Sequence, residues 1–241
     1  MVHFIYMLDP GLLVIFLFFM ILSIIVGSTL KSKFRKYSKT AMNYGMTGRE
    51  VAEKMLRDRG ITDVRVVSVK GQLSDHYNPK NKTVNLSPSV YNGNSISAAA
   101  VAAHESGHAI QHAEAYSMLQ FRTALVPIQN VSATILNFIF FAMFFGAIAL
   151  PGLVAWNTAL IIIIACYSVF TLFAFITLPV EVNASNRALE WLESSGITSR
   201  ETHPKAKDAL RWAGYTYLVA ALGALATLLY FLLMFLGGSS D

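Results

Sequence analysis

The sequence predicts a mainly α-helical membrane protein, with four transmembrane helices and one zincin-like α+β domain outside the bilayer. Hydrophobic residues make up 54% of the 241 residues and charged residues only 14%, whereas soluble domains carry about a quarter charged residues. The chain contains four apolar stretches, and each is long enough to cross about 30 Å of hydrocarbon as a helix. The polar segments between them leave room for one soluble domain of about a hundred residues.

Residues 11–30 form the first predicted span, because they carry no charged side chain and are long enough to cross a bilayer. A cleaved signal peptide is the alternative, and it would have basic residues before its apolar run. Residues 1–10 contain Asp9 but no Lys or Arg, whereas five basic residues follow between positions 31 and 39. We therefore expect an uncleaved anchor with the N-terminus outside and the following residues in the cytoplasm.

Residues 31–125 are polar and mixed in pattern, and we expect a cytoplasmic α+β domain there. Thr47 and Glu50 have the spacing of a capping box at the start of a helix. Valines at residues 64–69 predict one strand, and residues 83–86 predict a second. The second strand is either an exposed edge, able to pair with an extended peptide, or a strand that only packs inside the domain.

Residues 126–150 and 159–178 are the second and third predicted spans, and residues 215–236 are the fourth. The second span is expected to begin at Pro127. A short uncharged turn at residues 151–152 would make the second and third spans a helical hairpin.

Residues 179–214 connect the third span to the fourth, and we expect two cytoplasmic helices there. Pro179 is expected to close the third span, so that Glu181 stands at the head of the next helix. A second capping-box pattern at residues 198–201 is expected to open a basic helix.

The positions of the basic residues predict the topology. All 19 Lys and Arg residues lie within residues 31–122 or 187–211, and none lies in a segment assigned to the outside. Four spans with both termini outside therefore satisfy the positive-inside rule. The net charge of +5 is explained by this orientation, so we expect no nucleic-acid partner.

The chemistry of the chain centres on an HExxH motif in residues 95–119, which have the pattern of a helix. His104 and His108 are four residues apart, so their imidazoles share one helix face and can bind one metal ion. Glu105 is the next residue after His104 along the helix and lies beside the ion without having to bind it. A base at this position could take a proton from water activated by that ion. Zinc suits two neutral imidazoles and an oxygen ligand, with a fourth position left open.

HExxH supplies only two ligands, and a catalytic zinc usually has three from the protein. The candidates for the third are His112, Glu114, Glu181 and His203. His104 and His112 are about 12 Å apart along a helix, too far for both to bind one ion together with His108. Glu181 is favoured, because it follows a span and would be held at the same membrane surface as the HExxH helix.

Five stretches of the chain, one of which contains the HExxH motif, together resemble a known family. They are GMTG at 45–48, LSDHYNP at 73–79, LSPSVY at 86–91, AAHESGHAIQ at 102–111 and LPVEVNAS at 178–185. This family is that of the YugP-type neutral zinc metallopeptidases of bacterial membranes, which the five stretches together resemble. The resemblance implies His104, His108 and Glu181 as Zn²⁺ ligands and Glu105 as general base. A more distant similarity is to HtpX and the CAAX prenyl proteases, which carry an aspartate where this chain has Ser185. The residue that orients His104 is therefore left open.

The expected function is that of a gluzincin-like integral-membrane zinc endopeptidase in the bacterial inner membrane, with its site on the cytoplasmic face. Membrane proteins or peptides in extended form are the expected substrates. Two alternatives remain: an intramembrane site-2-type protease, whose HExxH would lie inside an apolar span, and a non-enzymatic scaffold with a closed, four-ligand zinc site. An oxyanion stabiliser is not assigned, the candidates being His76, Tyr77, Arg187 and His203.

Overall fold

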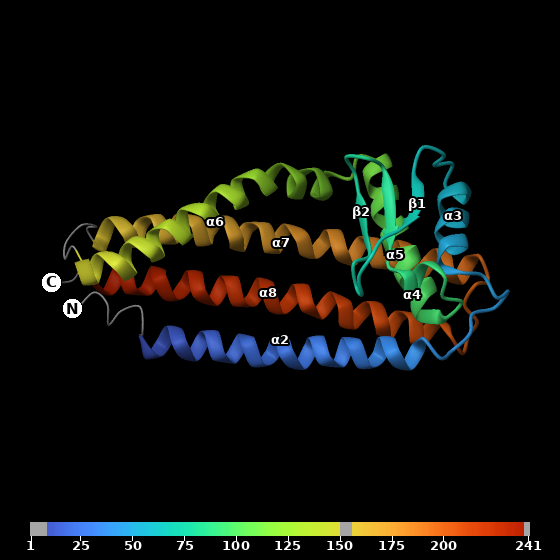
Figure 1. Ribbon diagram of the computed structural model, residues 1–241, viewed down its shortest axis with the longest axis horizontal. Helices are drawn as coiled ribbons and strands as arrows, with labels where there is room; N and C mark the ends of the chain where they lie inside the picture. Colours follow the sequence, from blue (N-terminus) through green and yellow to red (C-terminus); the bar gives the residue numbers. More distant parts are fainter. Residues whose placement is uncertain (1–8, 150–155, 239–241) are drawn as a thin grey trace. The chain divides into compact units, whose positions relative to one another are not determined.

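The computed structural model describes residues 9–149 and 156–238, and it confirms the predicted fold class. The described chain is mainly helical, with four long apolar helices and one three-stranded sheet (Figure 1). It divides into two compact units. Unit 1 comprises residues 1–24, 121–178 and 217–241, and unit 2 comprises residues 25–120 and 179–216.

The four long helices are each long and apolar enough to cross a membrane. They are α2 (Pro10–Tyr37), α6 (Ser117–Ala149), α7 (Trp156–Ser194) and α8 (His203–Gly238). Four candidate spans were predicted, and four are found in the described chain. The turn expected at residues 151–152 lies outside the described residues.

The long helices are more continuous than predicted. Pro127 lies inside α6 and Pro179 inside α7, so the expected helix boundaries at these prolines are wrong. The expected basic helix and the fourth span are likewise one helix, α8. A proline inside a helix removes one backbone hydrogen bond, whereas a break would leave several backbone groups without partners, so continuing the helix costs less.

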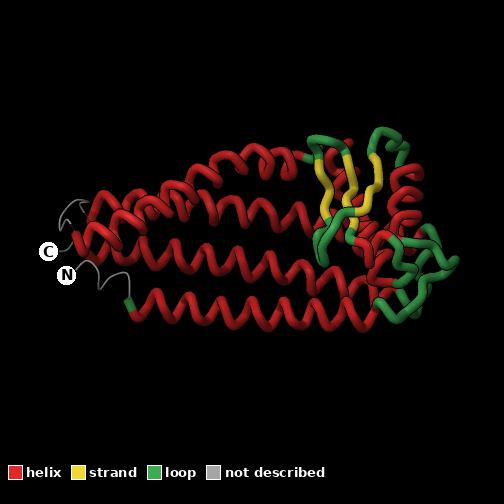
Figure 2. Tube along the Cα trace, viewed as in Figure 1, coloured by secondary structure: helices red, strands yellow, loops and turns green. Residues whose placement is uncertain are grey.

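Unit 2 contains the sheet, in the order β1 (Arg65–Ser68), β3 (Thr83–Leu86), β2 (His76–Asn78). The three strands lie side by side in Figure 2, with β1 parallel and β2 antiparallel to β3. The strand at residues 83–86 is therefore central and buried throughout, so of the two alternatives left open by the sequence, the strand that packs inside the domain is the one found. Strand β2 was not predicted, because three residues are too few to show an alternating pattern.

Helix α5 (Ile96–Ala113) forms the centre of unit 2 and contacts α3 (Gly48–Asp58), α4 (Pro88–Tyr91), β2 and β3. The alanines of its first three turns are almost fully buried, and their small side chains let these neighbours approach closely. The capping box at the start of α3 is present as predicted. The Glu50 amide donates to the Thr47 side chain, and the Thr47 amide donates to the Glu50 carboxylate.

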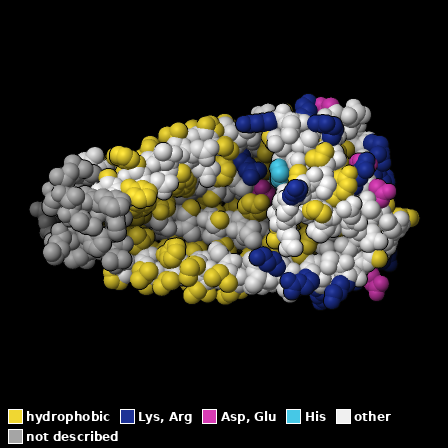
Figure 3. Space-filling model, in the orientation of Figure 1, with side chains coloured by type: hydrophobic (Ala, Val, Ile, Leu, Met, Phe, Trp, Pro, Cys, Tyr) yellow, Lys and Arg dark blue, Asp and Glu magenta, His cyan; other side chains and the backbone are white. Residues whose placement is uncertain are grey.

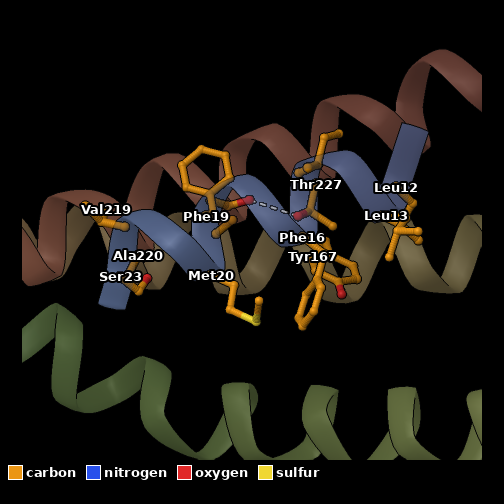
Figure 4. A pocket seen from close by; sticks show the side chains of 13 residues that line it. Leu12, Leu13, Phe16, Phe19, Met20, Ser23, Tyr167, Val219, Ala220 and Thr227 are labelled. Atoms are coloured by element: carbon orange, nitrogen blue, oxygen red, sulfur yellow. Dashed lines mark hydrogen bonds between the residues drawn. The ribbon is translucent and has the colours of Figure 1, made fainter. Parts of the chain in front are cut away.

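Unit 1 consists of the apolar parts of the long helices, and hydrophobic side chains dominate their surface in Figure 3. Exposed Phe16, Phe138 and Leu233 belong to this surface, which suits hydrocarbon. A cavity of about 590 Å³ lies between residues of α2 and α8, with Tyr167 of α7 beside them (Figure 4). Its lining is mostly apolar, as expected for a space within a bundle of membrane helices.

Candidate metal centre

Helix α5 brings the two histidines of the motif together. Its N-cap is Ser95, whose hydroxyl accepts a hydrogen bond from the Ala98 amide at 3.3 Å. The rings of His104 and His108 meet edge to face, with their centroids 4.8 Å apart. Both side chains are largely buried, so water competes little for their nitrogen atoms.

Glu181 lies beside these two rings. Its Oε2 is 3.2 Å from His104 Nε2 and 3.4 Å from His108 Nε2, and only 3% of the residue is exposed. Glu181 lies in the interior of α7, two residues after Pro179, so the expectation that it begins a helix is wrong. Within the described residues, this trio is the only group of three or more His, Cys, Asp or Glu residues close enough to share a metal ion.

The geometry of the trio fits a zinc ion. In a tetrahedral site with bonds of about 2.0–2.1 Å, neighbouring ligand atoms are about 3.3 Å apart. The two distances from Glu181 Oε2 to the imidazoles, 3.2 and 3.4 Å, match that separation. Two imidazoles and one carboxylate are also a donor set that zinc prefers at catalytic sites. His104, His108 and Glu181 would therefore hold the ion and leave a fourth position open.

A glycine allows α5 and α7 to come this close. A Cβ atom on Gly107 would lie 2.7 Å from the backbone oxygen of Ala184 and 3.2 Å from its Cα. No real side chain tolerates such contacts, so only glycine permits this approach. The glycine stands next to His108, and the alanine stands three residues after Glu181, so the close contact lies directly at the trio.

Each histidine has a hydrogen-bond partner on its other ring nitrogen. Ser185 Oγ lies 3.1 Å from His104 Nδ1. The residue that orients His104, which the sequence left open, is therefore Ser185. Gln111 Oε1 lies 3.0 Å from His108 Nδ1. Such partners fix the orientation of metal-binding imidazoles and raise their basicity.

Gln111 is a site residue that the sequence analysis missed. Its amide nitrogen donates to the Val180 carbonyl at 2.8 Å and to Asn183 Oδ1 at 2.9 Å, which ties α5 to α7 on either side of Glu181. A glutamine three residues after the second histidine, on the same helix face, was the available signal. That signal is weak, because many helices carry a glutamine at such a place.

The electrostatics of the trio favour a bound cation. Burial lowers the pKa of the His108 imidazole, but the nearby Glu181 and Glu105 carboxylates outweigh burial and hold that pKa above its ordinary value. The buried carboxylate thus attracts positive charge to this point. A metal ion would supply that charge with both imidazoles neutral, as metal binding requires.

Glu105 does not belong to the trio, but it lies next to it on α5 and is 9% exposed. The backbone amide of Tyr77, on strand β2, donates to Glu105 Oε2 at 3.0 Å. The Tyr77 amide therefore points away from β3 and toward the HExxH helix. This places one edge of β2 beside the motif.

The remaining candidates have other partners. Burial raises the pKa of the Tyr77 hydroxyl, which lies 2.8 Å from His112 Nδ1. Glu114 forms an ion pair with Arg187 at 2.7 Å, and this pairing holds the pKa of Glu114 below its ordinary value. His203 lies 3.2 Å from Thr198 Oγ1, and His76 lies 2.8 Å from the Ser74 carbonyl oxygen. None of these side chains belongs to the trio.

The comparisons with known proteins agree with this geometry. A family model described as "Putative neutral zinc metallopeptidase" matches residues 12–236 of the chain. The chain is also 40% identical over 213 residues to the "Putative membrane protease YugP" of Bacillus subtilis (strain 168), covering 88% of this chain and 91% of that protein. No solved structure matches the chain significantly.

Proposed function

This chain belongs to the family of neutral zinc metallopeptidases, and from that premise we propose that it is an integral-membrane zinc endopeptidase using His104, His108 and Glu181 as metal ligands. The observation that carries the proposal is the spacing of the three buried donor atoms. They come from two helices. A tetrahedral zinc ion held by three protein ligands would have its fourth position free for water. A zinc ion held there would make water acidic enough to ionise near neutral pH and would polarise the carbonyl of a peptide bond.

Glu105 is proposed as the general base. It takes a proton from the attacking water and returns that proton to the leaving amine as the peptide bond breaks. The Tyr77 amide holds one carboxylate oxygen at 3.0 Å and thereby fixes the direction in which the other oxygen faces.

Strand β2 is proposed as the place where the substrate docks. It is an edge strand and contacts the HExxH helix, and the bond from the Tyr77 amide to Glu105 places that carboxylate at the same edge. An extended peptide that pairs with this edge would be presented to the motif by main-chain hydrogen bonds. The edge role that the sequence left open for residues 83–86 is thus proposed for residues 76–78. Segments of membrane-associated proteins or peptides in extended form are the proposed substrates.

The proposed location is a bacterial cell membrane, with four spans, both termini outside and the site on the cytoplasmic face. The distribution of the 19 Lys and Arg residues supports this orientation. Lys and Arg side chains also gather over unit 2 in Figure 3. A site-2-type arrangement is less well supported, because α5 is not among the candidate spans.

The test uses Glu105→Gln in purified full-length protein, with zinc content measured by mass spectrometry and turnover measured on a peptide library. The variant should keep one zinc ion per chain and lose turnover by at least about a hundredfold, since general-base catalysis contributes about 10²–10⁴-fold. Near-normal turnover would refute the assigned role of Glu105. Wild-type protein that binds zinc but cleaves no peptide would instead favour the structural scaffold.

A further inference from the structure

A second cavity, of about 520 Å³, lies within unit 2 and outside the candidate metal centre. It is lined by the last turns of α2, the loop before β2, α4 with the residue before it, and the first turn of α5. Figure 1 shows the C-terminal end of α2 beside α4, in agreement with these contacts. Five of the lining side chains are serine hydroxyls: Ser38, Ser87, Ser89, Ser95 and Ser97.

Two cations on α2 line this cavity. Lys31 and Arg35 are one helical turn apart, so both side chains share the face of α2 that meets the cavity. Across residues 9–149 and 156–238, neither has a carboxylate within ion-pair distance. Lys33, on another face of the same helix, is by contrast paired with Asp208 at 2.7 Å. Lys31 and Arg35 are therefore not held in ion pairs within the described residues, and the lining keeps a net positive charge.

The acidic residue in the lining, Asp75, already has partners. It accepts hydrogen bonds from the Ser87 amide at 2.7 Å and the Ser87 hydroxyl at 3.1 Å. With two cations and one anion, the formal charge of the lining is +1. The N-terminus of α5, capped by Ser95, adds the positive end of an 18-residue helix dipole to the same wall.

These groups suit one class of ligand. A phosphate group accepts charge-assisted hydrogen bonds from Lys and Arg. The hydroxyls of Ser38 and Ser87 already donate, to the Arg35 carbonyl and to Asp75. The two cations are therefore the main donors that the cavity offers to a phosphate. Lys31 directly follows the apolar stretch 11–30 of the same helix. Arg35 lies only about 8 Å beyond its end at 1.5 Å per residue. That is the depth of lipid phosphates at a bilayer surface, where basic pockets bind anionic headgroups.

We propose that the cavity between α2 and the first turn of α5 binds a phosphate group through Lys31 and Arg35. The phosphate belongs to an anionic phospholipid headgroup or is the free anion, and the two sources share the same recognition chemistry. Because the HExxH helix begins at this cavity, an occupied site would hold that helix against the end of α2. The inference does not depend on peptide hydrolysis, and its test measures binding alone.

The experiment compares two double variants of the full-length protein in phosphatidylcholine nanodiscs. Lys31→Gln/Arg35→Gln removes the cavity cations. Lys36→Gln/Lys39→Gln removes the same charge from the last turn of α2 and the turn that follows it, outside the cavity lining. Binding of a fluorescent short-chain phosphatidylglycerol is titrated in each. Inorganic phosphate then competes at constant ionic strength.

The cavity variant should bind the probe at least about tenfold more weakly than the control, because general attraction to a basic surface falls equally in both. Competition by inorganic phosphate would assign the free anion, and its absence would assign the lipid. Equal binding in the two variants, or no saturable binding by wild type, would overturn the proposal.

A second variant distinguishes loss of the binding site from misfolding of the Lys31→Gln/Arg35→Gln variant. Ser89→Trp fills the cavity from its exposed side and leaves both cations in place. Loss of probe binding in this variant, with an unchanged circular dichroism spectrum, supports the proposal. Wild-type affinity in Ser89→Trp would contradict it.

Discussion

Gly107→Ala tests whether the packing of α5 on α7 sets the geometry of the candidate metal centre. The added Cβ would stand 2.7 Å from the Ala184 carbonyl oxygen. Ordinary contacts between carbon and oxygen are about 3.3 Å or longer. The two helices would therefore have to separate by about 0.6 Å, and no side-chain rotation can relieve the contact, because the facing atoms belong to the backbone.

Two opposing terms decide the effect on stability. Alanine is favoured over glycine inside a helix by about 1 kcal/mol, whereas overpacking costs about 1–3 kcal/mol. The free energy of unfolding should therefore fall by up to about 2 kcal/mol. The same separation would lengthen the 3.2 and 3.4 Å distances between Glu181 and the imidazoles toward 4 Å, beyond the roughly 3.3 Å of a tetrahedral site.

The assay is zinc affinity by competition with a chromogenic chelator, together with thermal unfolding. Zinc binding should weaken at least about tenfold in Gly107→Ala, as it does when the partners of metal ligands are disturbed. Gly214→Ala is the matched control, because a Cβ atom added to that helical glycine would meet no neighbouring atom within 4 Å. The control should gain about 1 kcal/mol of stability and bind zinc normally. Wild-type zinc affinity in Gly107→Ala would refute the packing argument.

The remaining predictions concern the ligands, their support and the topology. Glu181→Ala should lose most of its zinc and His112→Ala should retain it, in purified protein of matched fold quality; the opposite pattern would show that the third ligand is assigned wrongly. Ser185→Ala should weaken zinc binding by about tenfold through the loss of its 3.1 Å contact with a ring nitrogen, and an unchanged affinity would leave the serine without that role. A cysteine at Ser89, with Cys166 replaced, should resist an impermeant thiol reagent in intact cells and react after lysis; equal labelling before and after lysis would reverse the topology.

The spans and the two histidines could be predicted from local patterns. Four uncharged stretches of sufficient length predict four helices able to cross a bilayer, because length and apolarity are properties of each segment alone. His104 and His108 share a face because any helix places positions four apart together. The capping box at Thr47 and Glu50 is equally local, since the side chain of each residue bonds the backbone amide of the other within one helical turn.

The helix boundaries were less predictable, because they depend on the surroundings of each proline. By propensity alone, Pro179 should end a helix. The structure continues α7 through it, which carries Glu181 on one uninterrupted helix from the apolar segment to the site. The short strand β2 depends likewise on its neighbour, because its three residues are held by pairing with β3.

Which groups meet at the site was decided only by tertiary structure. Glu181 is 77 residues beyond His104, and nothing in either segment specifies how closely α5 and α7 approach. That approach depends on a glycine at position 107 facing the backbone of Ala184. The contacts of Ser185 and Gln111 with the histidine rings follow from the same packing. Sequence patterns determine which face of a helix a side chain occupies, while the distance between two helices is set by the volumes of the residues that meet between them.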